Sequence, residues 1–134
     1  MIKKLFFAVL VLLAGLLPRA WAYDGSVTLS DGQTIYYNYV SSSQSISITY
    51  PGSSYDNPWD GYTMPAGDLV IPDNITHNGT QYPVSQIGAG AFSGCTGLTS
   101  VTIPNTVTYI GGNAFANLSL STYIIIVQKV QKGL

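Results

Sequence analysis

The residues of this sequence that could do acid–base or nucleophilic chemistry are few. The chain has one histidine, His77, and one cysteine, Cys95. A catalytic cysteine needs a nearby cation to stabilise its thiolate, and neither Lys nor Arg occurs between residues 23 and 128. We therefore predict that Cys95 is a small buried apolar residue and that His77, beside an Asn-Gly pair, is a solvated turn residue. The sequence predicts no catalytic residue and no enzymatic activity.

Carboxylates are the remaining candidates, because they supply oxygen ligands for Ca²⁺. The segment Asp56-Asn57-Pro58-Trp59-Asp60 offers three oxygen-bearing side chains close together. It lacks the regular ligand spacing of a calcium loop, so we interpret it as a polar turn. We predict no metal site and no cofactor.

The charges of the chain are distributed unevenly. All six acidic residues are aspartates between residues 24 and 73, and the basic residues after residue 23 are only Lys129 and Lys132. Two lysines against six aspartates give this part of the chain a charge of about −4. An acidic surface without basic patches does not suit a phosphate backbone, so no nucleic-acid partner is expected.

Residues 1–22 have the composition of a signal peptide. A short basic start precedes an apolar run of 13 residues, 5–17, and Ala20-Trp21-Ala22 provides a small-x-small cleavage site. A membrane-spanning helix needs roughly 20 apolar residues, so we predict cleavage after Ala22 and no membrane span in the mature chain. The protein is expected to leave the cytoplasm.

Residues 84–106 and 107–129 are two copies of one 23-residue repeat. Internal repeats of this length are typical of stacked architectures. An interrupted copy precedes them, because residues 69–72 resemble residues 101–104. The interruption, at about residues 76–83, contains an Asn-Gly pair and predicts a hairpin with a type I′ turn. Seven positions are identical in the two full copies and are mostly apolar or Gly: Val84/Val107, Ile87/Ile110, Gly88/Gly111, Ala91/Ala114, Phe92/Phe115, Thr99/Thr122 and Ile103/Ile126.

Each repeat is expected to contain a strand, a strand-like edge and a short helical turn. Alternation in residues 98–103 predicts a strand with Val101 on the inner face. Ala91-Phe92 and Ala114-Phe115 predict the helical turns, and stacking would place Phe92 on Phe115. The same stacking aligns three apolar pairs in a parallel sheet: Leu69/Ile71, Val101/Ile103 and Ile124/Ile126. Glycines are expected to permit the tight corners: Gly88, Gly94, Gly97, Gly111 and Gly112.

The repeats, residues 68–126, are flanked by segments that do not fit the period. Residues 23–67 contain three β-rich stretches and a long connector, which we interpret as a small antiparallel cap, with Ile46 and Ile48 adding a strand before Leu69. Residues 127–134 form an irregular tail. The end of the chain is interpreted as a final capping strand, as a repeat array cut short, or as an anchor.

The repeat resembles that of BspA-like leucine-rich-repeat proteins of bacterial cell surfaces. The resemblance is carried by the spacing of apolar residues, Gly and Pro from Ile87 through Val107. Leu118 stands where the family has Cys, and Val127 stands where it has Pro. The resemblance implies a leucine-rich-repeat solenoid, α/β to mainly β with a parallel sheet and short helical turns. It also implies adhesion or protein binding, without cofactor or enzymatic activity, in a short or truncated member.

Our functional hypothesis is an exported or cell-surface protein that binds protein or glycan ligands outside the cell. The alternative is a truncated repeat fragment with a structural role or no function of its own. The ligand and the oligomeric state stay open. The expected binding face consists of residues that project from the parallel sheet: Asp68, Val70, Ser100, Thr102, Tyr123 and Ile125. Three connector aromatics are further candidates, Tyr55, Trp59 and Tyr62, although Trp59 could instead pack the cap against the first repeat.

Overall fold

The computed structural model describes residues 23–128, and these residues contain β-strands but no helix. The expected mainly β character is confirmed. The predicted signal peptide, residues 1–22, and residues 129–134 of the predicted tail lie outside the described residues. The strands are β1 (Gly25–Thr28), β2 (Thr34–Val40), β3 (Ser45–Thr49), β4 (Gly67–Val70), β5 (Asn74–His77), β6 (Thr80–Ile87), β7 (Leu98–Ile103), β8 (Tyr109–Ile110) and β9 (Tyr123–Ile126).

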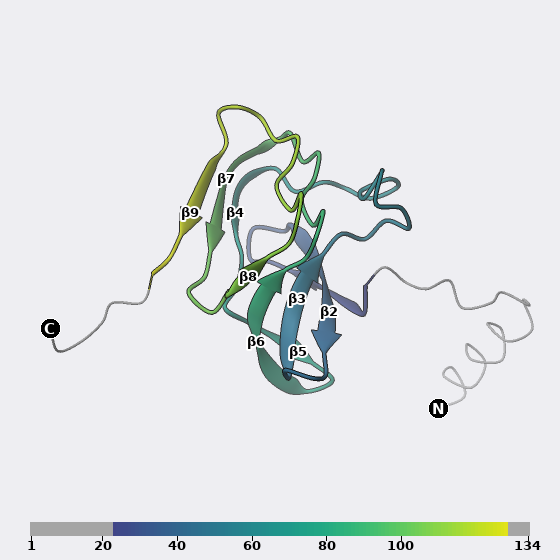
Figure 1. The fold of residues 1–134 in the computed structure, drawn as a ribbon, viewed down its shortest axis with the longest axis vertical. Helices are drawn as coiled ribbons and strands as arrows, with labels where there is room; N and C mark the ends of the chain where they lie inside the picture. Colours follow the sequence, from purple (N-terminus) through teal and green to yellow (C-terminus); the bar gives the residue numbers. More distant parts are fainter. Residues whose placement is uncertain (1–22, 129–134) are drawn as a thin grey trace, which may run out of the picture.

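The strands form two sheets (Figure 1). The larger sheet has the order β1-β2-β3-β6-β5, and β8 also pairs with β6. The smaller sheet has the order β4-β7-β9 and is parallel throughout. The larger sheet is mixed, because β1, β2 and β3 pair antiparallel whereas β3, β6 and β8 pair parallel.

The predicted hairpin is present. β5 pairs antiparallel with β6, from Asn74 opposite Pro83 to His77 opposite Thr80. Asn78 and Gly79, between the two strands, have φ angles of 48° and 82°. Both residue types tolerate this left-handed conformation, which a type I′ turn requires at its two central positions.

The meander of β1, β2 and β3 is present too, but its connection to the repeats differs from the prediction. Ile46 and Ile48 of β3 were expected to lie before Leu69 in its sheet. Instead, Ile46 pairs with Val84 and Ile48 with Ile87, both on β6. The prediction was wrong because it assumed one ladder for all repeats, whereas successive segments alternate between two ladders.

The register of the smaller sheet confirms the expected stacking. Leu69 of β4 pairs with Val101 of β7, which in turn pairs with Ile124 of β9. The second parallel ladder joins β3, β6 and β8 and includes Ile48, Ile87 and Ile110. Each repeat therefore contributes one strand to each sheet, and the apolar sides of both sheets bury the core.

The expected short helical turns are not observed at residues 89–94 and 112–117, which are successive tight turns. The N–H groups of Ala91, Ser93 and Cys95 donate to the carbonyls three residues earlier. The N–H groups that alternate with them, of Gly90, Phe92 and Gly94, donate instead to backbone carbonyls of the next repeat, at 2.8–3.0 Å. An α-helix would turn every N–H inward on its own chain, so this alternation excludes one.

The backbone conformation of the corners repeats with the sequence. Gly90 and Gly94 have positive φ, and so do Asn113 and Asn117 at the equivalent positions of the next repeat. Asn is among the few residues with a Cβ that often adopt this conformation. Gly88 and Gly111 serve another purpose, because a Cβ on Gly111 would clash with the Ala89 nitrogen and one on Gly88 would clash with the Ile48 carbonyl. These two glycines permit close approach of neighbouring backbones, rather than the left-handed corners.

Three aromatic rings form a stack through the core. Trp59 lies 6.4 Å from Phe92 at 20° between planes, and Phe92 lies 5.7 Å from Phe115 at 13°. Trp59 and Phe92 are buried, and Phe115 is half-buried at the end of the stack. The indole N–H of Trp59 donates to the Ala91 carbonyl at 3.1 Å, so its one polar atom is satisfied. The predicted stacking of Phe92 on Phe115 is confirmed.

Candidate binding surface

The six residues predicted to form a binding face lie together on the outer side of β4, β7 and β9. They form two rows across the sheet, because side chains of paired residues in a sheet project from the same side. One row consists of Asp68, Ser100 and Tyr123, and the other of Val70, Thr102 and Ile125. Val70, Tyr123 and Ile125 are 60%, 73% and 49% exposed.

Asp68 is fixed at one side of this face. Its Oδ1 accepts hydrogen bonds from the hydroxyls of Thr99 and Ser100, both at 2.8 Å. These two donors lower the pKa of the Asp68 carboxyl, because they favour its charged form. The face therefore runs from an ionised carboxylate on β4 to exposed apolar and aromatic side chains on β9.

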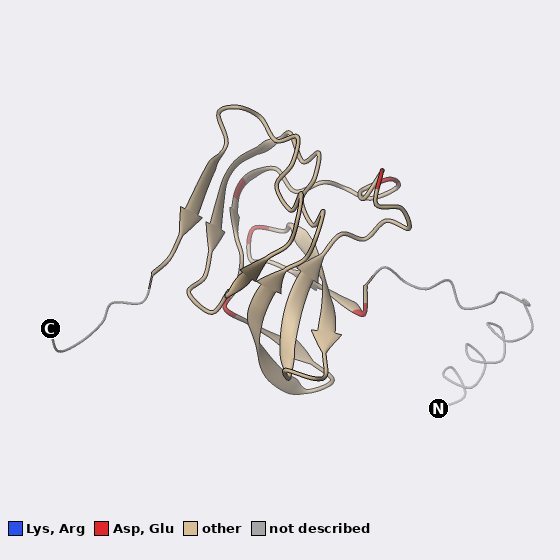
Figure 2. Cartoon of the chain, in the orientation of Figure 1, with Lys and Arg blue, Asp and Glu red and all other residues tan. Residues whose placement is uncertain are grey.

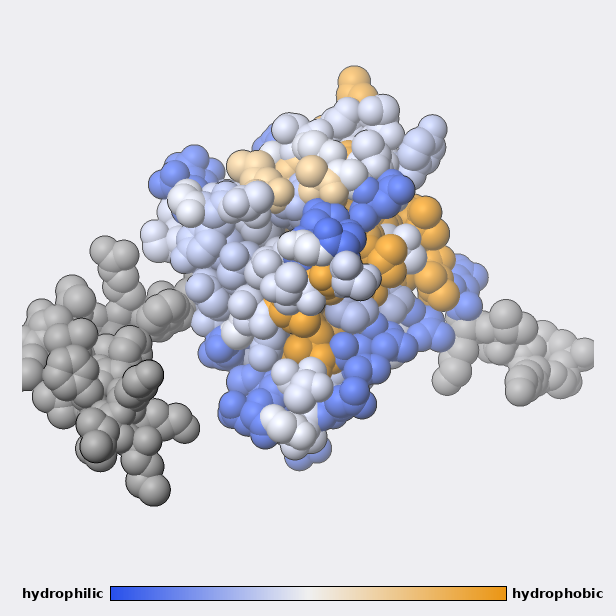
Figure 3. All heavy atoms as spheres, turned by 180° about the vertical axis from the view of Figure 1, so that it is seen from behind, coloured by the Kyte–Doolittle hydropathy of each residue, from blue (hydrophilic) through white to orange (hydrophobic). Residues whose placement is uncertain are grey.

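The last strand is an exposed apolar edge. Ile124 and Ile126 point to the core side of the sheet, yet they are 40% and 59% exposed. Figure 3 shows apolar residues gathered on the side of the molecule where β9 lies. Tyr109 and Ile110 of β8 are exposed as well, so both ladders end in apolar residues within residues 23–128.

The three connector aromatics have different surroundings. Trp59 is 2% exposed and packs the connector against the first full repeat, which is the alternative that the sequence left open. It is not available as a surface contact. Tyr55 is 47% exposed, and its hydroxyl accepts a hydrogen bond from the side-chain amide of Asn113 at 2.9 Å. Tyr62 is 38% exposed and belongs to a cluster of tyrosines.

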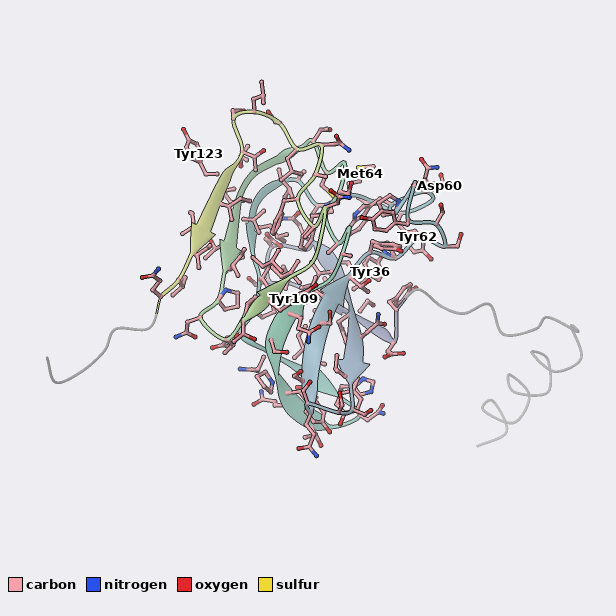
Figure 4. All side chains as sticks on the ribbon, in the orientation of Figure 1. Tyr36, Asp60, Tyr62, Met64, Tyr109 and Tyr123 are labelled. Carbon is pink, nitrogen blue, oxygen red and sulfur yellow. The ribbon has the colours of Figure 1, made fainter. Side chains whose placement is uncertain are left out.

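This tyrosine cluster borders a groove that the sequence did not reveal. The ring of Tyr62 lies 5.5 Å from Tyr36 and 6.4 Å from Tyr23. The groove has a volume of about 890 Å³ and lies between the β1–β2 turn and residues 61–66. Figure 4 shows Tyr36 and Tyr62 close to each other, away from Tyr123 on β9. The residues that line the groove include two of the tyrosines and four other residues: Tyr36, Tyr62, Asp31, Gln33, Met64 and Asp68.

Gln33 connects the two walls of the groove. Its side-chain carbonyl accepts from the backbone N–H of Ala66 at 2.8 Å, and its amide donates to Asp31 Oδ2 at 2.8 Å. Sequence reasoning missed the groove because Gln33 and Ala66 are far apart in the chain. The one available signal was the Asp31-Gly32 turn, which holds a carboxylate at the tip of a hairpin.

The residues that could do acid–base chemistry, His77, Asp56 and Asp60, do not come together. His77 packs against Tyr39, with ring centres 5.1 Å apart, and its Nδ1 hydrogen-bonds with the Tyr37 hydroxyl at 3.2 Å. His77 is therefore half-buried rather than fully solvated, because the larger sheet brings these two tyrosines against the hairpin. Asp56 and Asp60 instead border a small hollow that His77 does not line.

Cys95 is fully buried, as predicted. Desolvation raises the pKa of its thiol to about 12, so the thiol is neutral at physiological pH. Among residues 23–128, His, Cys and carboxylate side chains form no group of three suited to a metal ion. In the same range no helix is long and apolar enough to cross a membrane. Figure 2 shows no basic residue in the described chain, and its acidic residues are spread over several places rather than gathered in one cluster.

Comparisons with known proteins agree with the repeat pattern. Residues 70–132 match the model of the BspA type leucine rich repeat region. A leucine rich cell surface protein from Faecalibacterium prausnitzii is 30% identical with a TM-score of 0.55, over 77% of this chain and 24% of that chain. A leucine-rich repeat protein from Bacteroides ovatus is 28% identical with a TM-score of 0.53, over 70% of this chain and 22% of that chain.

A leucine-rich repeat protein from Bacteroides capillosus shares the fold, with 24% identity and a TM-score of 0.53 over 77% of this chain. The present chain covers 66% of that protein, so it spans less than two-thirds of the length of the solved structures it matches. No protein with a curated description matches the sequence. The predicted resemblance is confirmed, and the repeat segment of this chain belongs to the BspA-type leucine-rich-repeat family.

Proposed function

We propose that this protein is an exported, cell-surface repeat protein that binds protein or glycan ligands outside the cell and catalyses no reaction. The observation that carries the proposal is the pair of rows on β4, β7 and β9. Six side chains from three segments of the chain share one exposed face. Stacked repeats characteristically bind partners through such continuous faces.

The chemistry of this face suits contact with a macromolecule. Tyr123 and Ile125 supply exposed area that a partner could bury, and large aromatic side chains are frequent anchors of protein interfaces. Ser100 and Thr102 add hydroxyl groups beside them, which can donate or accept hydrogen bonds. The BspA-type repeat and the cell-surface description of the Faecalibacterium protein support export and a binding role for this chain.

The test measures binding of residues 23–134 to purified extracellular-matrix proteins, cell-surface proteins and glycans by biolayer interferometry. Thr102→Asp introduces a charge at the centre of the face. Loss of a central interface contact costs about 2 kcal/mol or more, so a decrease in affinity of at least about thirtyfold is expected.

The matched control is Thr76→Asp, on an exposed position of β5 outside this face. It should leave the affinity unchanged. Equal losses in both variants, or no binding to any member of the panel, would contradict the proposal. Export is tested by expressing the full chain in a bacterium and determining the mass of the secreted product, which should begin at Tyr23.

A further inference from the structure

The groove beside the tyrosine cluster combines two carboxylates with aromatic and thioether groups. Asp31 lies at the tip of the β1–β2 turn and Asp68 on β4, and both line the groove with Tyr36, Tyr62 and Met64. Asp68 is also part of the proposed binding face, so the groove opens next to that face. Residues distant in sequence are therefore gathered around one concave surface.

Both carboxylates are held in the ionised form. Asp31 accepts hydrogen bonds from the side chain of Gln33 at 2.8 Å and from its backbone N–H at 3.0 Å. These bonds lower the pKa of the Asp31 carboxyl. At Asp68, both hydroxyl donors bond to Oδ1, which leaves Oδ2 available to a ligand. Residues 23–128 contain no Lys or Arg, so no cation within the described chain neutralises either carboxylate.

The tyrosines provide the second part of the recognition chemistry. Tyr36 is half-buried against Trp59, with ring centres 5.8 Å apart, and is thereby held in place. Tyr62 packs against Tyr36 edge-on, at 76° between the ring planes, and is partly exposed at the groove. The face of an aromatic ring attracts a cation within about 6 Å of its centre.

From this combination we propose that the groove binds an arginine-bearing peptide segment of a partner protein. The guanidinium group is planar, donates to carboxylates and stacks on aromatic faces. It therefore suits both the carboxylates and the aromatic rings of the groove, and its positive charge complements the two aspartates. This inference rests on the proposed binding function and names the chemistry of one partner.

A neutral oligosaccharide is the rival occupant, because aromatic rings and Asp also line sugar sites. The groove suits it less well, since the amide best placed to bond sugar hydroxyls is already engaged. Both polar ends of the Gln33 side chain bond within the protein, to Asp31 and Ala66. A sugar would also leave the two carboxylate charges without a counter-charge.

The experiment uses a fluorescein-labelled dodecapeptide of Gly and Ser that carries three arginines. Its binding to residues 23–134 is followed by fluorescence anisotropy at low salt. The comparison peptide carries citrulline in place of arginine, which keeps the shape and removes the charge. We expect the arginine peptide to bind and the citrulline peptide not to bind.

Three variants locate the site. Exposed charge pairs contribute up to about 1 kcal/mol, so Asp31→Asn and Asp68→Asn should each weaken binding by up to about fivefold. Tyr62→Leu keeps an apolar side chain and removes the ring, with an expected loss of about threefold. The matched control is Asp73→Asn, on an exposed carboxylate outside the groove, which should leave the affinity unchanged.

Several outcomes would overturn the inference. Equal binding of the citrulline peptide would show that charge is not used. Equal weakening by Asp31→Asn and Asp73→Asn would show general attraction to an acidic protein rather than a site. Binding of a neutral oligosaccharide such as a xylan fragment, without the peptide, would identify a glycan groove. Failure of the peptide while the panel binding remains sensitive to Thr102→Asp would refute this inference and leave the proposed function standing.

Discussion

Replacing Phe92 by Ala is expected to destabilise the folded protein by about 3–5 kcal/mol. The ring of Phe92 is fully buried and lies between Trp59 and Phe115 in the aromatic stack. Phe115 is held in place by the backbone bonds that join successive corners, and Trp59 is held by the hydrogen bond from its indole N–H to the Ala91 carbonyl. The cavity left by the substitution therefore cannot close easily, which favours the upper part of this range.

Urea denaturation measures this loss directly. A slope of about 1–3 kcal/mol per molar is typical of small domains, so the unfolding midpoint should fall by about 2 M. Trp59 is the only tryptophan after residue 23, and its indole packs on Phe92. Its fluorescence therefore reports the same contact that the substitution removes.

Phe115→Ala provides the comparison, since Phe115 is half-buried and has a single ring neighbour in the stack. This substitution should lower the free energy of unfolding by about 1–2 kcal/mol, clearly less than Phe92→Ala does. If the two substitutions cost the same, the stack does not hold the repeats together as argued. A loss below about 1 kcal/mol at Phe92 would refute the reasoning altogether, because core phenylalanines cost far more.

Three further predictions concern a glycine, the cysteine and the edge strand. Gly111→Ala should lower the stability measured in thermal unfolding by about 1–3 kcal/mol, because the new Cβ would clash with the Ala89 backbone. The control is Gly112→Ala, whose Cβ would have no atom within 4 Å. It should lower the stability by no more than a few tenths of a kcal/mol. Cys95 should resist DTNB at pH 8 until urea unfolds the chain. Because the pKa of Cys95 is raised to about 12 in the folded protein, the thiol of the unfolded chain loses its proton at lower pH. The free energy of unfolding should therefore decrease as the pH rises from about 9 to about 12. This decrease should be absent in Cys95→Ala. Ile125→Lys should reduce self-association measured by light scattering, because a charge blocks pairing at an exposed edge; unchanged scattering would contradict this.

Much of the repeat core was predictable because its period is regular. The spacing of 23 residues sets Val101 beside Ile124, and alternation sets which side chains point inward. The Asn78-Gly79 turn was predictable from its two residue types alone. These features depend on local sequence or on a fixed period, so the sequence determines them without knowledge of the rest of the fold.

Features that join non-equivalent segments were not predictable in this way. Ile48 pairs with Ile87, a separation set by the long connector and the hairpin rather than by the period. The corner turns were mistaken for helical turns, since Ala and Phe do not reveal where an N–H donates. A signal was available, because Gly90 and Asn113 share the repeat position and both tolerate positive φ. The groove depends on a contact of Gln33 that has no local signature.

The structure extends the stacking beyond the segment that the sequence marks as a repeat. β3 precedes the predicted repeats, residues 68–126, yet it pairs parallel with β6 as β6 pairs with β8. Trp59 stacks on Phe92 as Phe92 stacks on Phe115. Stacking requires a flat aromatic ring and two apolar strands, and these can be supplied by residues unlike those of the repeat.

This extension also explains where the groove lies. The connector before β4 places Trp59 on Phe92. Residues 60–66, which follow Trp59 in the chain, then lie beside β2. That path brings Tyr62 against Tyr36 and Met64 to the groove. The concave surface is thus a consequence of extending the aromatic stack by one ring, and Trp59→Ala should disturb peptide binding in the groove more than Thr102→Asp does.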